Sequence, residues 1–493
     1  MGEQAGHMDT AHPLVCATVT GRSTAELRAR RDAQTGADLV EVRIDTVGDP
    51  DAAGAIAGRA LPVVVTCRRS DEGGWFRGSE QERRALLLAA LDAGADYVDL
   101  EFGHGFDDEI RTRHGRHIVL SLHDFEGCPA DLEARVDAMA ALCPDVLKLA
   151  VTVSRVADCG RLAAIGRQHA GRPMVLIAMG EAGLVTRLLP GRFGSCWTYA
   201  GDGVAPGQID TERLHAEFRF RRIGPHTALY GIAGQPVAHS LSPAMHNAAF
   251  QSLGLDAAYV PLAAADTADL FDGMRMLGLA GASVTAPFKV EVMTGLASCE
   301  EDARQTGAVN TLVRGAGGWR GHNTDLDGFL AGCAGFALNR QRVAVLGTGG
   351  AARAVALAAR RAGAEVTCYG RDPAKAGALA AALGVGAAPR PVPAGAWDLL
   401  VNATPVGTHP DTDQSAFPES SYDGRVVYDL VYNPARTRFL REASARGCRT
   451  IGGLGMLVAQ ARRQVELWTG LRPDAGPMRE AAEWSLSRQA ERT

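Results

Sequence analysis

The sequence predicts an α/β protein in which a (β/α)8 barrel is followed by a second α/β unit containing a doubly wound parallel sheet. Between residues 14 and 200, eight short apolar runs alternate with longer helical patterns, which is typical of such a barrel. Farther on, the apolar run at 342–346 leads straight into a glycine-rich turn and an alanine-rich helix, as in doubly wound sheets. With 493 residues, the chain is also too long for one core, so two or three domains are expected.

The barrel prediction depends on eight strand-like runs: LVCATV, DLVEVRID, PVVVTCR, YVDLEF, HIVLSLHDF, VLKLAV, PMVLIAMG and FGSCWTYA. Polar residues gather toward the C-terminal ends of these runs, where this fold carries its catalytic side chains. Any one of them is equally well explained as a strand-end residue that faces solvent. Their convergence on one rim nevertheless favours a site, and the residues concerned are Glu41, Arg43, Arg68, Glu101, His123 and Lys148.

Lys148 lies inside the apolar run DVLKLAV, which is a costly place for an ammonium group. The chain contains 51 Lys and Arg residues, and only three of these, at 148, 289 and 375, are lysines. Lysine can become a neutral nucleophile, whereas arginine stays protonated. With His123 one strand earlier, this pattern predicts Schiff-base chemistry on a ketone, with His123 moving protons. Burial among Val146, Leu147 and Leu149 is expected to favour the neutral amine; the alternative is a buried lysine paired with an acid for structure.

Motifs of this half resemble type I 3-dehydroquinate dehydratases: EVRID, TCRRSDEGG, SLHDF, VLKLAV, TRLLPGRFGS and APGQ, spread over residues 39–208. The resemblance implies that Lys148 is the Schiff-base lysine and that His123 is a general acid/base oriented by Glu72. It also implies a set of substrate-binding residues, in which Arg187 holds the carboxylate, Met179 packs on the ring, and the ring hydroxyls are bound by Glu41, Arg43, Arg68 and Gln208.

One position departs from that family, because Val204 stands where its members usually have serine in the loop S-A-P-G-Q. Losing one hydroxyl typically removes a hydrogen bond of about 0.5 to 1.5 kcal/mol. We therefore expect weaker loop closure or slower turnover and no loss of chemistry.

The second unit begins after a charged, proline-ended connector, FRFRRIGP, at 218–225. Further strand-like runs follow it: ALYGIAG, YVPLA, GASVTAP, AVNTLV, GHNTDLDG, EVTCYG, LLVNATPVG and VVYDLVYNP. The predicted domains are a barrel at 1–222, a second α/β domain at 223–334 completed by C-terminal helices at 456–493, and a Rossmann-type domain at 335–455.

The glycine-rich turn has the spacing G-x-G-x-x-A, formed by Gly347, Gly349 and Ala352. A strand before it and a helix after it provide the context that dinucleotide binding requires. At the end of the next strand, Arg371 can pair with a 2′-phosphate, which indicates NADP(H). Asp372 is the counter-argument, although before a proline it is also a natural helix cap. The other residues expected at the cofactor are Gly350, Ala351, Asn402, Thr404 and Gly455.

Lys289 and Asp325 form a second constellation, because reducing a ketone requires a proton for its oxygen and a lysine beside a carboxylate can relay one. Taken singly, Asp325, Ser240 and Ser242 are well explained as helix-capping residues. Together with a dinucleotide loop downstream, a catalytic interpretation gains weight. Lys375 is most simply a solvated helix residue.

Six motifs here resemble shikimate dehydrogenases and occur in the same order: GIAGQPVAHSLSPAMHN, VTAPFK, GAVNTL, GHNTDLDG, GTGGAARA and GLGMLVAQA. The resemblance implies that Lys289 and Asp325 are the catalytic pair. It implies that the substrate carboxylate is bound by Ser240 and Ser242 with Tyr432, and the ring hydroxyls by Thr285, Asn310, Gln460 and Gln464. Ser283 departs from the asparagine of many single-domain members and matches the plant fusion enzymes.

Taken together, the two halves resemble the plant fusions of these two enzymes. The expected function is Schiff-base dehydration of 3-dehydroquinate followed by NADPH-dependent reduction to shikimate. One rival is a catabolic quinate/shikimate dehydrogenase fused to the same dehydratase, and another is a non-catalytic metabolite sensor. Arg371 favours NADP and hence the biosynthetic function over the catabolic one. The presence of Lys148, Lys289, His123 and Asp325 argues against a non-catalytic sensor that has lost an active site.

Composition limits the partners and the location. A net charge of −5 gives no reason to expect nucleic acid or an anionic membrane as a partner. Ten cysteines without a CxxC pair or zinc-ligand spacing predict free thiols, a reducing compartment and no metal site. No signal peptide or membrane span is visible. We therefore expect a cytoplasmic enzyme acting on small molecules, and the Ala, Arg and Gly bias favours a bacterial source.

Overall fold

The computed structural model describes residues 10–201, 203, 207–417 and 422–491. The chain forms two compact units, one of Met1–Thr227 with Val260–Gly278, and one of Ala228–Tyr259 with Leu279–Thr493. No helix in the described ranges is both long and apolar enough to cross a membrane.

The first unit contains the predicted barrel, and the eight apolar runs are its strands. All strand pairs in the sheet are parallel, in the order β7-β6-β5-β4-β3-β2-β1-β8. A bridge between Met174 and Ser195 links β7 to the segment before β8. The strands are β1 (Leu14–Val19), β2 (Leu39–Arg43), β3 (Val63–Thr66), β4 (Tyr97–Glu101), β5 (Ile118–Asp124), β6 (Val146–Thr152), β7 (Met174–Met179) and β8 (Trp197–Ala200).

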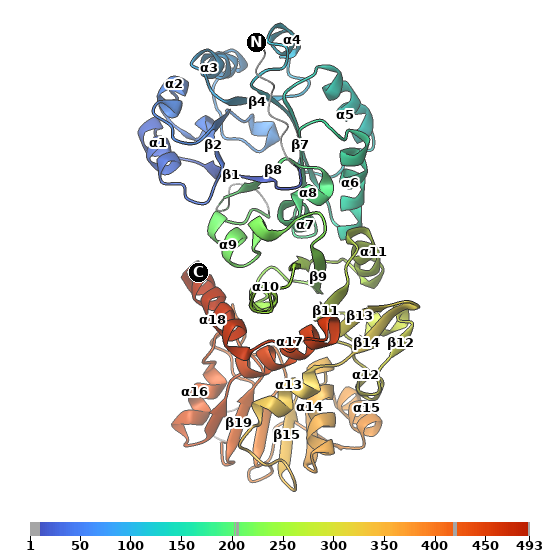
Figure 1. Cartoon of the computed structure of the whole chain (residues 1–493). Coiled ribbons are helices and arrows are strands. Elements are labelled where there is room, and N and C mark those ends of the chain that lie inside the picture. The colour runs from blue at the N-terminus through green and yellow to red at the C-terminus, as the bar shows by residue number, and fades with distance from the viewer. Residues whose placement is uncertain (1–9, 202, 204–206, 418–421, 492–493) are drawn as a thin grey trace. The chain divides into compact units, whose positions relative to one another are not determined.

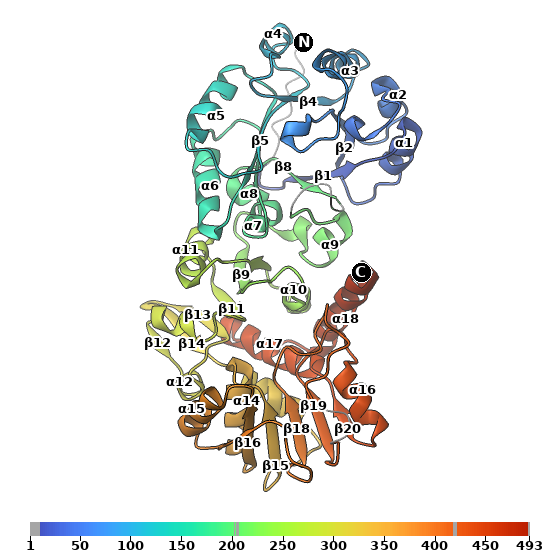
Figure 2. The same ribbon diagram turned by 180° about the vertical axis from the view of Figure 1, so that it is seen from behind.

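Helices between these strands lie around the outside of the barrel (Figure 1), and the view from behind shows the same ring (Figure 2). Their ends follow local rules: α3 begins with a capping box in which Ser79 and Glu82 satisfy each other's backbone amides. The helices are α1 (Thr24–Asp32), α2 (Ala52–Ile56), α3 (Glu80–Asp92), α4 (Asp107–Thr112), α5 (Leu132–Ala141), α6 (Cys159–Gln168), α7 (Leu184–Leu188), α8 (Pro190–Phe193) and α9 (Thr211–Ala216).

A mixed six-stranded sheet follows, in the order β10-β9-β11-β13-β14-β12. Its strands are β9 (Ala228–Ala233), β10 (Ala257–Leu262), β11 (Gly281–Val284), β12 (Ser298–Cys299), β13 (Thr311–Gly315) and β14 (Gly318–His322). The helices in this stretch are α10 (Ser242–Ser252), α11 (Thr267–Leu277), α12 (Glu301–Thr306) and α13 (Asp325–Gly332).

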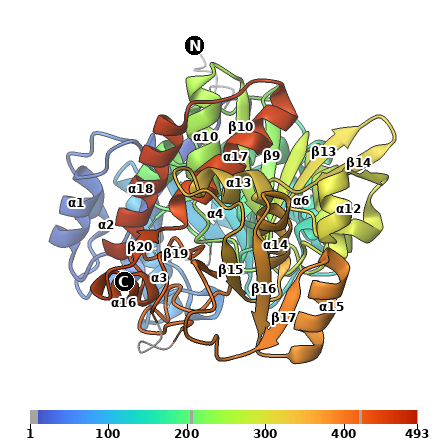
Figure 3. The same ribbon diagram turned by 90° about the horizontal axis from the view of Figure 1, so that it is seen from below.

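The third sheet is parallel and has the order β17-β16-β15-β18-β19-β20, which is the doubly wound Rossmann arrangement. Alternate residues of β15 face opposite sides. Val343 and Val345 pack with residues of α14 (Gly350–Arg361), whereas Ala344 and Leu346 pack with residues of α16 (Arg438–Ala445). Figure 3 shows strands β15, β16 and β17 side by side. The strands are β15 (Arg342–Leu346), β16 (Glu365–Gly370), β17 (Gly386–Pro389), β18 (Leu399–Asn402), β19 (Val426–Asp429) and β20 (Arg449–Ile451).

The helices of this last part are α14 (Gly350–Arg361), α15 (Pro373–Leu383), α16 (Arg438–Ala445), α17 (Leu454–Thr469) and α18 (Ala475–Glu491). Side chains of α17 reach back to the second sheet, where Trp468 donates a hydrogen bond to the Leu312 carbonyl. The predicted fold class, a (β/α)8 barrel followed by a unit with a Rossmann-type domain, is therefore confirmed.

Candidate active sites

Lys148 lies in the interior of the barrel and is only 6% exposed. Its Nζ lies 2.9 Å from Oδ2 of Asp99 and 3.3 Å from Oε1 of Glu41. The Tyr199 ring centroid is 4.2 Å from Nζ, close enough for a cation–π contact. Two carboxylates and an aromatic face thus offset the cost of burying this ammonium group.

The apolar surroundings expected for Lys148 are only partly present. Because side chains alternate along a strand, Val146 and Ala150 share the interior face with Lys148 and belong to the barrel's inner cluster. Leu147 and Leu149 point to the opposite face, so they do not surround the amine. The two interpretations of this lysine, as a nucleophile and as a structural partner of acids, do not exclude each other, because Lys148 contacts the acids from the third position of β6, inside the barrel.

Arg68 organises the acids around the lysine. Its guanidinium lies 2.8 Å from Asp99 and 3.0 Å from Glu101, and it donates a hydrogen bond to Ser121. Burial alone would raise the pKa of the Asp99 carboxyl, but the charges of Arg68 and Lys148 hold it below its usual range. Asp99 therefore stays ionised between two cations. Glu41 is held in the same layer by the hydroxyls of Thr18 and Thr66.

His123 is on β5, two residues after Ser121, and Ser121 pairs in register with Lys148. Because residues two apart on a strand share a face, the side chains of His123 and Lys148 both face the interior. His123 Nδ1 lies 3.0 Å from Oε2 of Glu72, which belongs to the short helix η2 (Ser70–Glu72). Burial, and then the charges of Arg68 and Lys148, hold the pKa of His123 well below its ordinary value. The imidazole is therefore neutral at neutral pH and able to accept a proton.

Glu72 contacts a second histidine that sequence reasoning missed. His104 Nε2 lies 3.2 Å from Oε1 of Glu72, on the side away from His123. Burial raises the pKa of Glu72 to about 8, against the effect of Arg68. Exposure rises outward along this chain of side chains, from 9% at His123 to 27% at His104.

The remaining barrel residues occupy the carboxyl-end side of the strands in different ways. Arg43 is held by both oxygens of Asp45, at 2.9 and 2.7 Å, and Met179 ends β7. Arg187 is buried on α7, which follows β7, and burial lowers its pKa to about 10. Gln208 donates a hydrogen bond to the Thr18 hydroxyl. Val204 lies outside the described residues.

In the second unit, most residues predicted at the substrate line one cavity of about 650 Å³. The structure brings them together from the second sheet and the segments around it, from α14, from the segment after β19, and from α17. The predicted residues that line the cavity are Ser240, Ser242, Thr285, Lys289, Asn310, Asp325, Ala351, Tyr432, Gln460 and Gln464. Lining residues that the sequence did not single out include His239, Thr408, His409 and Met456.

Lys289 and Asp325 are in direct contact in this cavity, with Nζ 2.6 Å from Oδ2. The other carboxylate oxygen of Asp325 accepts a hydrogen bond from Asn310 Nδ2 at 2.8 Å. Asp325 is the first residue of α13, so it is both a first-turn acid, as the simpler explanation held, and the partner of the lysine. Lys289 is 20% exposed and Asp325 is 7% exposed, which leaves the pair open to the cavity.

The oxygen and the nitrogen of the Gln464 side-chain amide are both fully engaged in hydrogen bonds with protein groups. Its Oε1 accepts from the Ser283 hydroxyl at 2.8 Å and lies 3.1 Å from His246 Nε2. Its Nε2 donates to the Asn310 carbonyl and to the Thr311 hydroxyl. Gln464 therefore shapes the floor of the cavity, whereas Gln460 reaches Asn310 through a longer contact of 3.4 Å. Ser283 fits because Tyr259 donates to its hydroxyl at 2.6 Å.

The nucleotide loop has the geometry that its spacing predicted. Gly347 has a φ of +123°, and a Cβ there would lie 2.9 Å from the Ala403 carbonyl oxygen, so only glycine fits. Gly349 is the N-cap of α14, which leaves the helix amides directed at the loop. A Cβ on Gly350 would approach the Lys289 side chain to 3.1 Å, so this loop adjoins the catalytic pair.

Arg371 and Asp372 have different roles, as the interpretation of Asp372 as a helix cap predicted. Arg371 is exposed directly after β16, whereas Asp372 accepts from the backbone amides of Ala374 and Lys375 and caps α15. Lys375 is exposed on that helix. Asp372 is therefore engaged as a cap, and the counter-argument against NADP loses its force.

Asn402 and Thr404 shape the turn after β18. The Asn402 amide donates to Asp429, while its carbonyl oxygen accepts from both the backbone and the hydroxyl of Thr404. Gly455 lies in the first turn of α17, and a Cβ there would meet nothing within 4 Å. Asn402 pairs with Leu346, the residue before the loop, so the turn after β18 adjoins the loop.

Comparison with protein families divides the chain in the same order. The model of type I 3-dehydroquinase matches residues 15–225, and that of the shikimate dehydrogenase substrate binding domain matches 232–312. The model of the coenzyme F420-dependent NADP oxidoreductases matches 342–432, and that of the shikimate 5′-dehydrogenase C-terminal domain matches 453–483.

Similar proteins cover either the whole chain or its second half. The chain is 32% identical to a bifunctional 3-dehydroquinate dehydratase/shikimate dehydrogenase of Arabidopsis thaliana, described as chloroplastic, over 93% of this chain and 82% of that protein. It is 39% identical to a shikimate dehydrogenase (NADP(+)) of Carboxydothermus hydrogenoformans, over 53% of this chain and 98% of that one. A crystal structure of a shikimate dehydrogenase in complex with NADP+ matches with a TM-score of 0.51 and 34% identity, over 54% of this chain and 97% of that chain.

Proposed function

This chain belongs to the family of bifunctional 3-dehydroquinate dehydratase/shikimate dehydrogenases, and from that membership we propose how its residues divide two successive reactions. The barrel dehydrates 3-dehydroquinate to 3-dehydroshikimate, and the second unit reduces 3-dehydroshikimate to shikimate with NADPH. The supporting observation is that each half holds a lysine in contact with a carboxylate. The Nζ–Oδ2 distance is 2.9 Å for Lys148 and Asp99 and 2.6 Å for Lys289 and Asp325.

In the barrel, Lys148 attacks the ketone carbon through the lone pair of its deprotonated Nζ, and the carbonyl oxygen leaves as water when the C=N bond forms. Asp99 and Glu41 contact Nζ and stabilise the cationic imine. Arg187 binds the substrate carboxylate, with Met179 against the ring and Gln208 at a hydroxyl.

His123 carries the proton steps of the dehydration. The iminium acidifies the neighbouring C–H bond, so neutral His123 removes that proton, and the electron pair expels the hydroxyl group on the next carbon. His123 returns the proton to this hydroxyl, which leaves as water. Hydrolysis of the imine then restores the ketone and frees Lys148. Glu72 orients His123 and stabilises its cationic form.

In the second unit, NADPH when bound supplies the hydride for the carbonyl carbon. Lys289 gives the proton from Nζ to the carbonyl oxygen, and Asp325 holds that ammonium in place. Ser240, Ser242 and Tyr432 hold the substrate carboxylate. The hydroxyl groups of the ring are held by Thr285, Asn310 and Gln460, while Gln464 positions Asn310 and Thr311.

The described residues fit NADP(H). Gly347 makes a tight turn in which any Cβ would press on the Ala403 carbonyl, and the amides of α14 face the loop. Arg371 is exposed directly after β16, and the carboxylate of the adjacent Asp372 is engaged in capping α15. We also propose the domain limits 1–222, 223–334 with 456–493, and 335–455. A cytoplasmic location is proposed as well, and cell fractionation would test it.

Initial rates on the purified chain test this function. Dehydration of 3-dehydroquinate and oxidation of shikimate with NADP are both expected. The oxidation of shikimate with NADP should be faster than that of quinate and faster than that with NAD. A clear preference for quinate with NAD would contradict the proposal.

Borohydride added with 3-dehydroquinate should attach mass at Lys148, and an unmodified Lys148 would overturn the barrel mechanism.

A further inference from the structure

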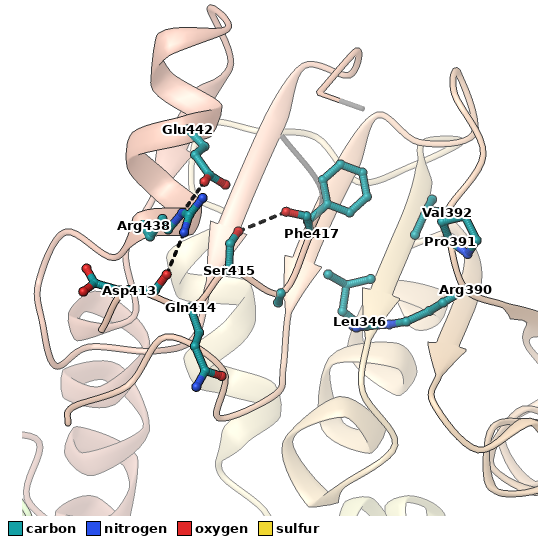
Figure 4. Close-up of a pocket in the computed structure, with 11 residues that line it drawn as sticks. Leu346, Arg390, Pro391, Val392, Asp413, Gln414, Ser415, Phe417, Arg438 and Glu442 are labelled. Carbon is teal, nitrogen blue, oxygen red and sulfur yellow. Dashed lines mark hydrogen bonds and ion pairs between the residues drawn. The ribbon is translucent and has the colours of Figure 1, made fainter. Parts of the chain in front are cut away.

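A pocket of about 770 Å³ lies beside the Rossmann-type sheet, and its lining includes none of the residues assigned above. Its walls come from Leu346 at the end of β15, from Arg390 after β17, from the loop at 413–417 and from α16 (Figure 4). Two of its charged residues are already paired, because Arg438 donates to Glu442 at 2.5 Å and to the Asp413 carbonyl at 2.8 Å. The other arginine, Arg390, has no such partner among the described residues.

One edge of the Arg390 guanidinium carries no hydrogen bond. Nε and Nη2 are buried, and neither has a hydrogen-bond partner among the residues that the structure describes. Figure 4 shows the side chain running from the end of β17 toward Leu346, across the carboxyl edge of the sheet. Nε and Nη2 together form the planar edge that binds two oxygens of one carboxylate or phosphate group. Buried donors left unpaired are costly, which indicates a missing acceptor.

Strand register places Arg390 next to Arg371. Leu346 pairs with Tyr369, and Gly370 pairs with Pro389. Arg371 and Arg390, the residues that follow Gly370 and Pro389, therefore leave their adjacent strands at the same level, one residue beyond the level of Gly347. Burial, and after it the positive charge of Arg371, lowers the pKa of Arg390. Two cations thus lie together, and the nearest acid in sequence, Asp372, is engaged in capping α15.

We propose that Arg390 is a second anchor, with Arg371, for the 2′-phosphate of NADP(H), and that it sets the preference for NADP(H) over NAD(H). Ligands of doubly wound sheets bind beyond the carboxyl ends of the strands, with the ribose of the adenosine at the end of the second strand. That strand is β16, and Arg390 reaches over it from β17. A dianionic phosphate would satisfy the open edge of Arg390 and relieve its repulsion from Arg371. This inference rests on the proposed use of NADP(H) and extends it to a specific residue.

Paired ligands that differ only in the 2′-phosphate test the inference. Isothermal titration of the full chain would compare adenosine 2′,5′-bisphosphate with adenosine 5′-monophosphate, and NADPH with NADH. Arg390→Met should weaken binding of the two 2′-phosphorylated ligands by about 10- to 100-fold, the range for a lost charged hydrogen bond. Binding of the two ligands without this phosphate should change by less than about twofold.

Arg438→Met is the matched control, because it removes a cation from the same pocket that already has protein partners. It should leave all four affinities within about twofold of the unmodified chain. Arg390→Lys keeps the charge but loses the planar edge, so an intermediate and still phosphate-selective loss is expected. This variant keeps the test decisive if Arg390→Met does not fold.

An equal loss for all four ligands would overturn the inference, since it would mean that Arg390 packs on adenine or supports the fold. No loss for any ligand would overturn it as well. The proposed cofactor fails separately: if the unmodified chain binds NADH as tightly as NADPH, the use of NADP(H) is wrong. If the unmodified chain prefers NADPH and Arg390→Met retains that preference, only the role of Arg390 is wrong.

Discussion

The two lysines assigned to chemistry differ in their surroundings. Lys148 is almost fully buried in the barrel and contacts two carboxylates and an aromatic ring. Lys289 is partly open to a cavity and contacts one carboxylate. A nucleophile that forms a covalent imine benefits from exclusion of water and from anions that stabilise the cationic intermediate. A proton donor must instead recover its proton from solvent after each turnover. The difference in burial therefore matches the difference in proposed role.

Single substitutions of the two lysines give the largest expected effects and would break the comparison most directly. Lys289→Ala removes the proton donor, so kcat of shikimate oxidation should fall by about 10²- to 10⁴-fold. Dehydration of 3-dehydroquinate should stay unchanged. Lys148→Ala should instead reduce dehydration of 3-dehydroquinate, leave shikimate oxidation unchanged and abolish borohydride trapping. Each variant is the control for the other in the two rate assays, and loss of both activities in either variant would contradict separate sites.

The buried acids of the barrel should matter for stability as well as for chemistry. Asp99→Asn removes the carboxylate between Arg68 and Lys148, and breaking a buried pair in this way costs about 3–5 kcal/mol. For a domain of this size that corresponds to a fall of roughly 6 °C or more in the Tm of the barrel transition.

Asp92→Asn provides the matched control for that stability measurement. Asp92 pairs with Arg113 on the barrel surface at 2.6 Å, and such exposed pairs contribute about 0–1 kcal/mol. Calorimetry should separate the two variants clearly. Equal Tm values would show that Asp99 is not needed to offset the buried charges.

The fold was predictable because its signals are periodic or local. Eight apolar runs with helical spacers and one strand followed by a glycine turn are properties of neighbouring residues, and the structure confirms both. Lys148 could be found through its rarity and His123 through its strand. Asp372 could be recognised as a cap because capping requires only the two residues that follow it.

Residues that act through tertiary contacts were harder to find. Asp99 alternates with Glu101 in YVDLEF, and two acids on one face of a buried strand were an available signal that the inward face is polar. His104 gave no such signal, because it lies in a loop and meets Glu72 only in the folded chain. The partners of Gln464 are also distant: His246 is 218 residues away. Arg390 depends on strand register, which the sequence pattern does not specify.

The pH dependence of the barrel sharpens the role given to Glu72. Its pKa is raised to about 8, so the carboxyl is protonated below that pH and ionised above it. Only the ionised form stabilises the imidazolium of His123, hence kcat for dehydration should rise as the pH approaches 8 and level off above it. Glu72→Gln is neutral at every pH, so the rise should vanish and kcat should fall by about 10- to 100-fold at pH 9, as for a lost charged hydrogen bond. A rise that persists in Glu72→Gln would assign this limb to another group.

The smallest expected effect concerns His104, which contacts Glu72 from the solvent side at 3.2 Å. Burial, and then the charge of Arg69, lowers the pKa of His104, so the ring is neutral above pH 7 and its Nε2–H can donate to the ionised carboxylate. His104→Phe removes this donor. It should raise the pH at which kcat levels off and lower kcat at pH 7 by about threefold to tenfold, since one hydrogen bond contributes about 0.5–1.5 kcal/mol. His104→Gln retains a donor and should restore most of the profile. If both variants match the unmodified chain, Glu72 is held by His123 and its buried neighbours alone, and the solvent side of the relay has no role in setting its charge.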